Sequence, residues 1–360
     1  MKSRLIYIEL LRILAVFLVV FIHTRSDGFF LFAQYPPASL QYWLYLFVSI
    51  SVQVAVPIFL AVSGAVLLHR PSEPLRVLWR SRIMKMLAIL IVFSLAYHIE
   101  EIICYGGTFS MLGFLGRVYS STAKYHLWFL YLYIGFLIAL PILRTLAQRL
   151  TPQFFYYIFA LDLILNGLLP MAEFILYPES APLNSNIKVF LLRSPVILYP
   201  LLGYFLRHRI RYESLRRIVP RLWVACLLSI LISCYMTHYR GIVMGSLSEE
   251  SSQMFHNSFG LLKCAAVFAT MRLLFERKRL SQTTTGIIHS LGRCTFGIYL
   301  LHAFFMGQYL FIPMHRHLNS ALGLHPLLST TLTCLTIFLL SYLITLILSQ
   351  IPLLKKIVGF

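Results

Sequence analysis

Charged residues are scarce in this chain of 360 residues: they make up 12% of it, whereas hydrophobic residues make up 59%. An ordinary soluble domain carries roughly 25% charged residues. Acidic residues are the rarest, with 12 Asp and Glu against 31 Lys and Arg. So little charge excludes a soluble globular protein for most of the chain, and the remaining solvent is lipid.

Other features are also missing. The six cysteines form no Cys-x-x-Cys pair and lie in or beside apolar segments, so we expect small buried side chains rather than a disulfide framework. The His-x-His motif at His315 and His317 offers too few ligands to predict a metal site. No polar segment is long enough for a separate soluble module, so we expect one transmembrane domain over residues 1–360.

Long apolar runs dominate what is present. A helix needs about 20 mostly apolar residues to cross a bilayer, and the runs are too long, and alternate too little, for barrel strands. The sequence therefore predicts an all-α, polytopic membrane bundle of about ten transmembrane helices. The expected segments are 5–24, 42–68, 84–103, 126–146, 153–170, 187–206, 219–236, 256–275, 287–311 and 325–350.

Basic residues are distributed unevenly between the loops. If the N-terminus is cytoplasmic, the outer segments hold only Arg25, Arg117, Lys124, Lys188, Arg240 and Arg316, and most other Lys and Arg are cytoplasmic. This asymmetry follows the positive-inside rule and predicts that both termini are cytoplasmic. The net charge of +19 therefore indicates orientation in a membrane, and we expect no nucleic-acid partner.

Three ionisable residues lie in the first apolar segment, where charge is costly and marks a candidate site. They are Glu9, Arg12 and His23. Arg12 and His23 are eleven residues apart, so they share one helix face about 16 Å apart along its axis, and Glu9 is close enough to Arg12 for an ion pair. Spacing alone also fits a role as interface anchors, but histidine is well suited to accept a hydroxyl proton near neutral pH.

Four segments, in order along the chain, resemble motifs of the membrane acyltransferase family 3. The first has the family's acidic residue, then Arg, then ten residues and a His; the others resemble its F-F-x-x-S-G, H-L-W-F-L and G-x-x-S-F-x-I-Y-L-x-H motifs. Thr295 replaces the serine of the last motif. The segments are Ile8–His23, Pro57–Gly64, His126–Leu130 and Leu291–His302. The resemblance covers the whole chain.

The resemblance implies transfer of an acyl group, usually acetyl from acetyl-CoA as co-substrate, to a hydroxyl of a glycan or lipid, with no permanently bound cofactor. It makes His23 and Arg12 the expected essential residues, with His23 as general base and Glu9 holding Arg12. The chain looks closest to short members that O-acetylate bacterial surface glycans. We therefore expect a multi-pass protein of the bacterial cytoplasmic (inner) membrane.

The family's cytoplasmic R-x-x-R pair maps onto Arg82 and Lys85, and Arg80 lies beside it. These cations would bind the phosphates of CoA, although a lysine lacks the bidentate fork of arginine. Further candidates for the pocket are Ser63, His126, Trp128, Tyr299 and His302. An aromatic belt at the membrane surface explains His126 and Trp128 about as well.

Two other functions remain compatible with the sequence: a transporter or flippase of a lipid-linked glycan, and a non-enzymatic partner in polysaccharide export. Both explain many apolar helices, but neither explains the order of the motifs. The 16 Å between Arg12 and His23 is a difficulty for the enzyme, since one thioester cannot touch both residues. A broken helix, a long pantetheine reach or an acyl relay would resolve it.

Overall fold

The computed structural model describes residues 5–178, 194–245, 255–307, 309–352 and 354, and these residues form helices and connecting turns without any strand. The expected all-α class is therefore confirmed for this part of the chain. The helices are α1 (Ile6–Ile22), α2 (Leu40–Val52), α3 (Ala55–Leu67), α4 (Leu75–Leu78), α5 (Met84–Tyr105), α6 (Met111–Ser120), α7 (Trp128–Arg149), α8 (Pro152–Asp162), α9 (Leu169–Leu176), α11 (Pro195–His208), α12 (Tyr212–Val243), α14 (Gly260–Phe275), α15 (Gln282–Phe305), α16 (Phe311–Arg316) and α17 (Pro326–Leu348).

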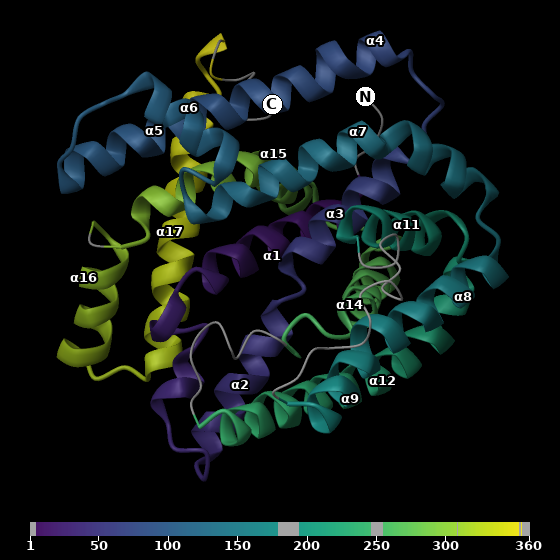
Figure 1. Ribbon diagram of the computed structural model, residues 1–360. Helices are drawn as coiled ribbons and strands as arrows, with labels where there is room; N and C mark the ends of the chain where they lie inside the picture. Colours follow the sequence, from purple (N-terminus) through teal and green to yellow (C-terminus); the bar gives the residue numbers. More distant parts are fainter. Residues whose placement is uncertain (1–4, 179–193, 246–254, 308, 353, 355–360) are drawn as a thin grey trace.

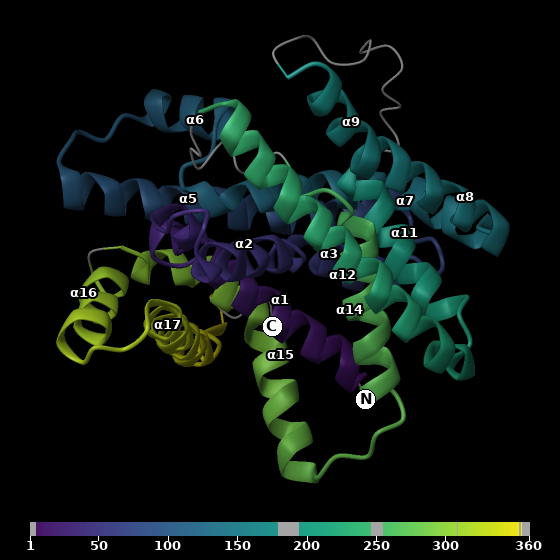
Figure 2. The same ribbon diagram turned by 90° about the horizontal axis from the view of Figure 1, so that it is seen from below.

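The first helix lies in the middle of the bundle. It packs against α3, α14, α15 and α17, and Figure 1 shows α5 and α7 above this group and α12 below it. Seen from below in Figure 2, α16 and α17 lie on one side and α8 and α9 on the other. Because other helices enclose α1, its Glu9 is buried in protein, whereas the side chain of Arg12 is partly exposed.

Helix ends follow local sequence signals. Ser39, Ser110, Thr151 and Ser281 each accept a hydrogen bond from a backbone N–H in the first turn of α2, α6, α8 and α15. These side chains satisfy donors that the first turn would otherwise leave unpaired. Proline stands in the first turn of α8, α11 and α17, where its missing N–H costs nothing.

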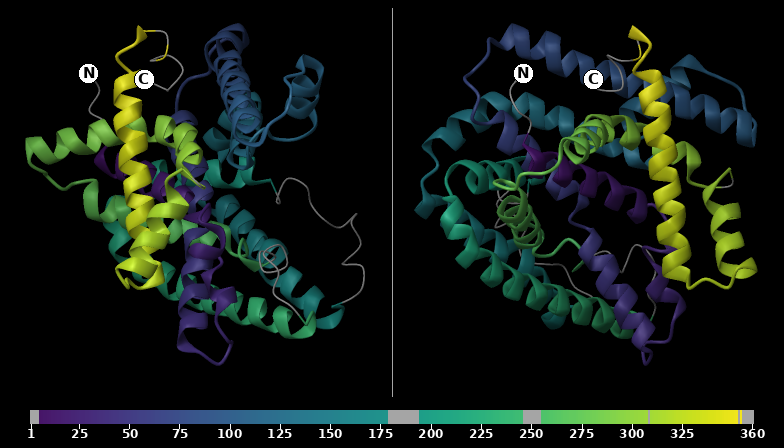
Figure 3. Two further views of the ribbon diagram at one scale, coloured as in Figure 1. Left: turned by 90° about the vertical axis from the view of Figure 1, so that its left-hand side faces the viewer. Right: turned by 180° about the vertical axis from the view of Figure 1, so that it is seen from behind.

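Six helices of the described chain are long and apolar enough to cross a membrane: Leu40–Leu67, Leu75–Tyr105, Tyr125–Arg149, Pro152–Leu176, Tyr212–Val243 and Pro326–Leu348. Each of the ten expected segments contains helix, but α1, α11 and α14 have 17 residues or fewer, so a count of ten spans stays a prediction. The start of α1 and the end of α17 lie toward the same side (Figures 1 and 3). Which side is cytoplasmic also stays a prediction.

The closest helix crossing joins α3 and α11 through two glycines. A Cβ atom on Gly64 would lie 2.0 Å from the carbonyl oxygen of Pro200, and one on Gly203 would lie 1.8 Å from that of Ala61. No other residue type fits such a backbone approach, and small residues at a crossing are how membrane helices pack without a hydrophobic driving force. The Ser-Gly pair of the second motif therefore marks a structural contact at its glycine.

The second apolar segment breaks between α2 and α3, at Gln53 and Val54. A break leaves the last carbonyls of α2 without helical partners. Lys263, which is buried, donates to one of them, the carbonyl of Ile50 (3.4 Å), and to that of His256 (2.6 Å). A cation at a helix C-terminus is favoured by the helix dipole, so this lysine caps the broken helix, and the break places Gln53 beside α1.

Candidate active site

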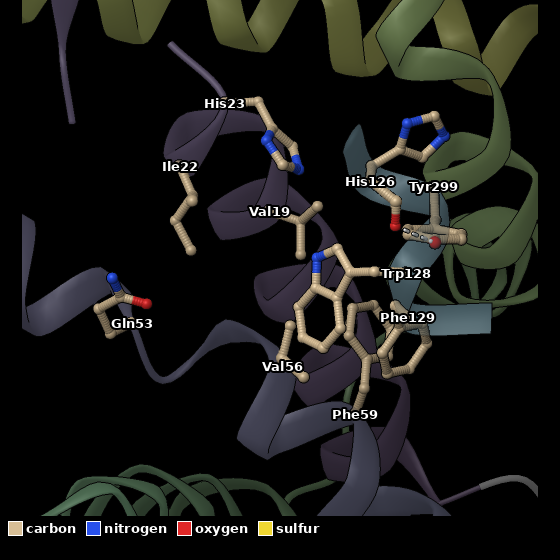
Figure 4. Close-up of a pocket in the computed structure, with 10 residues that line it drawn as sticks. All are labelled: Val19, Ile22, His23, Gln53, Val56, Phe59, His126, Trp128, Phe129 and Tyr299. Atoms are coloured by element: carbon tan, nitrogen blue, oxygen red, sulfur yellow. Dashed lines mark hydrogen bonds between the residues drawn. The ribbon is translucent and has the colours of Figure 1, made fainter. Parts of the chain in front are cut away.

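A cavity of about 80 Å³ lies at the end of α1. Four of the expected site residues line it: His23, His126, Trp128 and Tyr299. Its lining residues are Val19, Ile22, His23, Gln53, Val56, Phe59, His126, Trp128, Phe129 and Tyr299. Figure 4 shows Gln53 on one side of this space and the aromatic side chains together on the other. Trp128 is 45% exposed, whereas His126 and Tyr299 are buried. The cavity thus joins a buried polar wall to an exposed indole.

Three histidine rings gather here: His23 and His126 line the cavity, and His302, which does not line it, contacts both. His23 follows α1, His126 precedes α7, and His302 lies in the last turn of α15. The ring centroids of His23 and His302 are 5.4 Å apart with the planes stacked, those of His126 and His302 are 4.9 Å apart, and those of His23 and His126 are 6.4 Å apart. Residues separated by more than 270 positions therefore form one cluster, which we call the histidine cluster.

Hydrogen bonds from tyrosine hydroxyls hold the helices around this cluster. Tyr299 on α15 donates to the carbonyl of His126 at 2.7 Å, and Tyr97 on α5 donates to the carbonyl of Leu300 at 2.7 Å. All four partners are buried. Buried hydrogen bonds between helices fix the relative position of the helices, because breaking such a bond leaves a buried polar group without a partner. The cluster is therefore supported by α5, α7 and α15 together.

Several nitrogens of the cluster have no hydrogen-bond partner in the described part of the chain. They are Nε2 of His302 and at least one ring nitrogen of His126, whose ring also lies near the backbone of Leu300. His126 is 1% exposed and His302 is 0% exposed, so these atoms are shielded from bulk water. Buried polar atoms without partners are uncommon and often mark a place where a ligand or water binds.

The expected ion pair is present at the other end of α1. Arg12 Nη1 lies 3.3 Å from Glu9 Oε1, and Glu9 is 2% exposed. Gly292 on α15 makes room for this carboxylate, since a Cβ there would lie 2.1 Å from Glu9 Oε2. Helix α1 runs without interruption from Ile6 to Ile22, so a broken first helix does not bring Arg12 to His23.

The expected donor residues lie on a helix rather than in a loop. A π-helical turn at Trp79–Ile83 joins α4 to α5, so that the helix is continuous from Leu75 to Tyr105. Arg82 Nε lies 3.0 Å from Glu73 Oε1, and Arg144 Nη2 of α7 lies 3.1 Å from the same oxygen. Burial raises the pKa of the Glu73 carboxyl, but the two arginines lower it by more, so the pKa lies below its ordinary value. Glu73 is therefore an anion at neutral pH and forms an ion pair with the guanidinium of Arg82.

The other donor candidates differ from Arg82. Arg80 is exposed and Lys85 is half-buried, and neither side chain forms a hydrogen bond or ion pair with another described residue. Both side chains can bind an anion without first breaking an ion pair within the described chain.

Ser63 lies outside this site. Its hydroxyl donates to the carbonyl of Phe59 one turn earlier at 2.8 Å, and it does not line the cavity. Sequence reasoning missed Gln53, whose amide faces the cavity, and Glu73, which bridges two arginines. A polar glutamine inside an apolar run was the available signal for the first. Among the described residues no group of three or more His, Cys, Asp or Glu side chains is placed to hold a metal ion.

A bundle with helices apolar enough to cross a membrane, a cavity lined by two histidines and a basic helix start fits the class of membrane-embedded enzymes. Comparison with protein families gives a match to a model described as an acyltransferase domain over residues 5–346, which is essentially the whole chain. The chain belongs to acyltransferase family 3. No curated protein and no solved structure matches it significantly.

Proposed function

We propose that this protein transfers an acetyl group from cytoplasmic acetyl-CoA to a hydroxyl of a cell-surface polysaccharide or lipid-linked glycan in the bacterial cytoplasmic membrane. The observation that carries the proposal is the placement of His23 at a cavity with an exposed indole, in a chain of acyltransferase family 3. The small cavity supports a short acyl group. An exposed tryptophan beside a polar amide supports a sugar, because indole faces pack against sugar rings while amides bind hydroxyls.

The chemistry assigned to His23 is general-base catalysis. Its ring takes the proton of the acceptor hydroxyl while the oxygen attacks the thioester carbonyl carbon. The carbon–sulfur bond then breaks, and His23 returns the proton to the leaving thiolate, so that the products are an ester and free CoA. Glu9 holds Arg12, whose guanidinium stabilises negative charge on the donor.

On the donor side, Arg80, Arg82 and Lys85 bind the phosphates of CoA. Their clustering supports this role, since three cations on two helical turns attract a polyanion. Because Arg82 is paired with Glu73, the donor phosphate displaces that carboxylate or binds beside it through Arg80 and Lys85. The pantetheine arm then carries the acyl group along the bundle toward His23.

Replacing His23 with alanine tests the proposal. We expect purified wild-type protein in lipid vesicles to release free thiol from acetyl-CoA only with a glycan acceptor, and mass spectrometry to find the acylated glycan. His23→Ala should lower the rate by about 10²–10⁴-fold with unchanged expression and thermal stability. His315→Ala is the control, since His315 is also buried but lies on α16.

Two outcomes would overturn the assignment. A folded His23→Ala variant with near-normal acylation removes His23 from the chemistry. Wild-type protein that moves a lipid-linked glycan across vesicles without consuming acetyl-CoA would instead support the transporter or flippase that the sequence leaves open, which no contact among the described residues favours.

A further inference from the structure

His302 is a completely buried imidazole whose protonation pattern is fixed by its own helix. Its Nδ1 lies 2.7 Å from the carbonyl oxygen of Tyr299, one turn earlier on α15. A carbonyl oxygen only accepts, so Nδ1 carries the hydrogen in this bond. In the neutral ring, Nε2 then carries a lone pair that can accept a hydrogen bond.

That lone pair has no partner among the described residues. A buried acceptor without a partner destabilises the fold, so a histidine that only filled space here would not need this nitrogen. The ring instead stacks on His23 with the centroids 5.4 Å apart and the planes 22° apart. Of the other two cluster rings, His302 is the nearer to His23, since His126 lies 6.4 Å away.

No carboxylate of the described residues orients His23. Among the described residues its ring contacts are Tyr125, His126 and His302, and no hydrogen bond or ion pair joins it to an Asp or Glu. A histidine that acts as base uses one nitrogen for the proton and needs an acceptor for the N–H on the other, which a carboxylate supplies in the Ser-His-Asp arrangement. The unpartnered Nε2 of His302 is a suitable acceptor.

We propose that His302 is the positioning residue of the catalytic base, an inference that rests on the proposed function. Its Nε2 accepts the N–H of His23, directly after a small ring rotation or through one water of the adjoining cavity. This bond selects the His23 tautomer whose other nitrogen faces the acceptor hydroxyl. It also stabilises the imidazolium that forms when the acceptor's proton arrives, and His302 keeps its own proton on Nδ1 throughout.

The test compares two substitutions at His302 with a matched one at His315. His302→Leu removes the acceptor and keeps an apolar side chain of moderate size. His302→Gln restores a carbonyl oxygen in place of the ring nitrogen. His315→Leu is the control for burying leucine in place of histidine, because His315 is buried with an unpartnered Nε2 yet stacks on Phe311, outside the histidine cluster.

We expect His302→Leu to lower kcat roughly 10–100-fold with the KM for acetyl-CoA unchanged, since an outer partner tunes a ligand or base without binding the donor. His302→Gln should recover part of that loss, and His315→Leu should keep wild-type kcat. A residue that only stabilises the fold would give equal losses for leucine and glutamine together with a lower unfolding temperature.

A second readout does not need acyl transfer. Diethyl pyrocarbonate modifies unprotonated imidazole nitrogens, and peptide mass spectrometry follows each histidine separately. An acceptor on the opposite N–H makes the free nitrogen of His23 more reactive, so His302→Leu should slow modification of His23 several-fold while His315→Leu leaves it unchanged.

Equal modification of His23 in wild type and His302→Leu, or wild-type kcat in His302→Leu, overturns the proposal. A wild-type protein that transfers no acyl group removes the proposed function, whereas the modification rates still decide whether His302 orients His23.

Discussion

Replacing Gly64 with alanine tests the closest packing in the bundle, and the structure sets the size of the effect. The new Cβ would lie 2.0 Å from the carbonyl oxygen and 2.3 Å from the Cα of Pro200. Both are backbone atoms that no rotamer change can move. To bring the contact to about 3.4 Å, α3 and α11 must part by about 1.4 Å.

Over-packing of this kind costs about 1–3 kcal/mol. Gly203→Ala should cost a similar amount, since its Cβ would lie 1.8 Å from the carbonyl oxygen of Ala61 on the facing helix. The two glycines share one crossing, so the double variant should lose less than the sum of the single losses. Once the helices have parted for one methyl group, the second finds room.

The assay is thermal unfolding of detergent-solubilised protein. We expect the midpoint of Gly64→Ala to fall by roughly 2–4 °C for each kcal/mol lost. Gly135→Ala in α7 is the matched control, because a Cβ there meets nothing within 4 Å and alanine is the better helix former by about 1 kcal/mol. A Gly64→Ala midpoint equal to that of wild type would refute the close approach of α3 and α11. If the stability losses of Gly64→Ala and Gly203→Ala add strictly in the double variant, the two glycines do not share one crossing.

Three further predictions concern orientation and the donor. Reporter fusions after Lys124 should report outside and fusions after Arg217 inside, and the reverse pattern would overturn the charge-based topology. Arg82→Ala should raise the KM for acetyl-CoA, and the fold-change should be smaller at high salt, where the attraction that Arg82 supplies in the wild type is already screened. Glu73→Gln should lower that KM by freeing the guanidinium, and unchanged values in both would place the donor site elsewhere. Incubation with acetyl-CoA without acceptor should leave the intact mass of the protein unchanged, and an added acetyl group would demonstrate a relay.

Sequence spacing was enough to predict what lies on one helix. Glu9 and Arg12 are three residues apart, and the ion pair between them follows from helix geometry alone. The family motifs likewise predicted His126, Tyr299 and His302 as pocket candidates. The structure brings the rings of His126 and His302 to His23, and that of Tyr299 to His126. The roles of these residues stay predictions, because contacts do not measure chemistry.

Contacts between distant segments were beyond the sequence. Glu73 meets Arg144 across 71 positions, and nothing in either local pattern indicates the partner. Gln53 lines the cavity at the break in its segment, and the carbonyl of Ile50 before this break accepts from Lys263 of another helix. Predicting that Gly64, rather than Ser63, is the critical residue of its motif also required knowledge of the facing helix. Only the position of Pro200 on α11 shows why a side chain cannot fit at Gly64.

The unbroken first helix constrains how the acyl group reaches His23. Arg12 and His23 are about 16 Å apart along a rigid axis, and residues 13–22 between them carry no hydroxyl, thiol or amine that could hold an acyl group. On the facing helix α15, Cys294 is fully buried and the hydroxyl of Thr295 is bonded to the carbonyl of Gly292. With no available nucleophile on the described parts of these two helices, the proposed function requires a flexible pantetheine arm, long enough to join phosphates held at the helix start to a thioester at the histidine cluster.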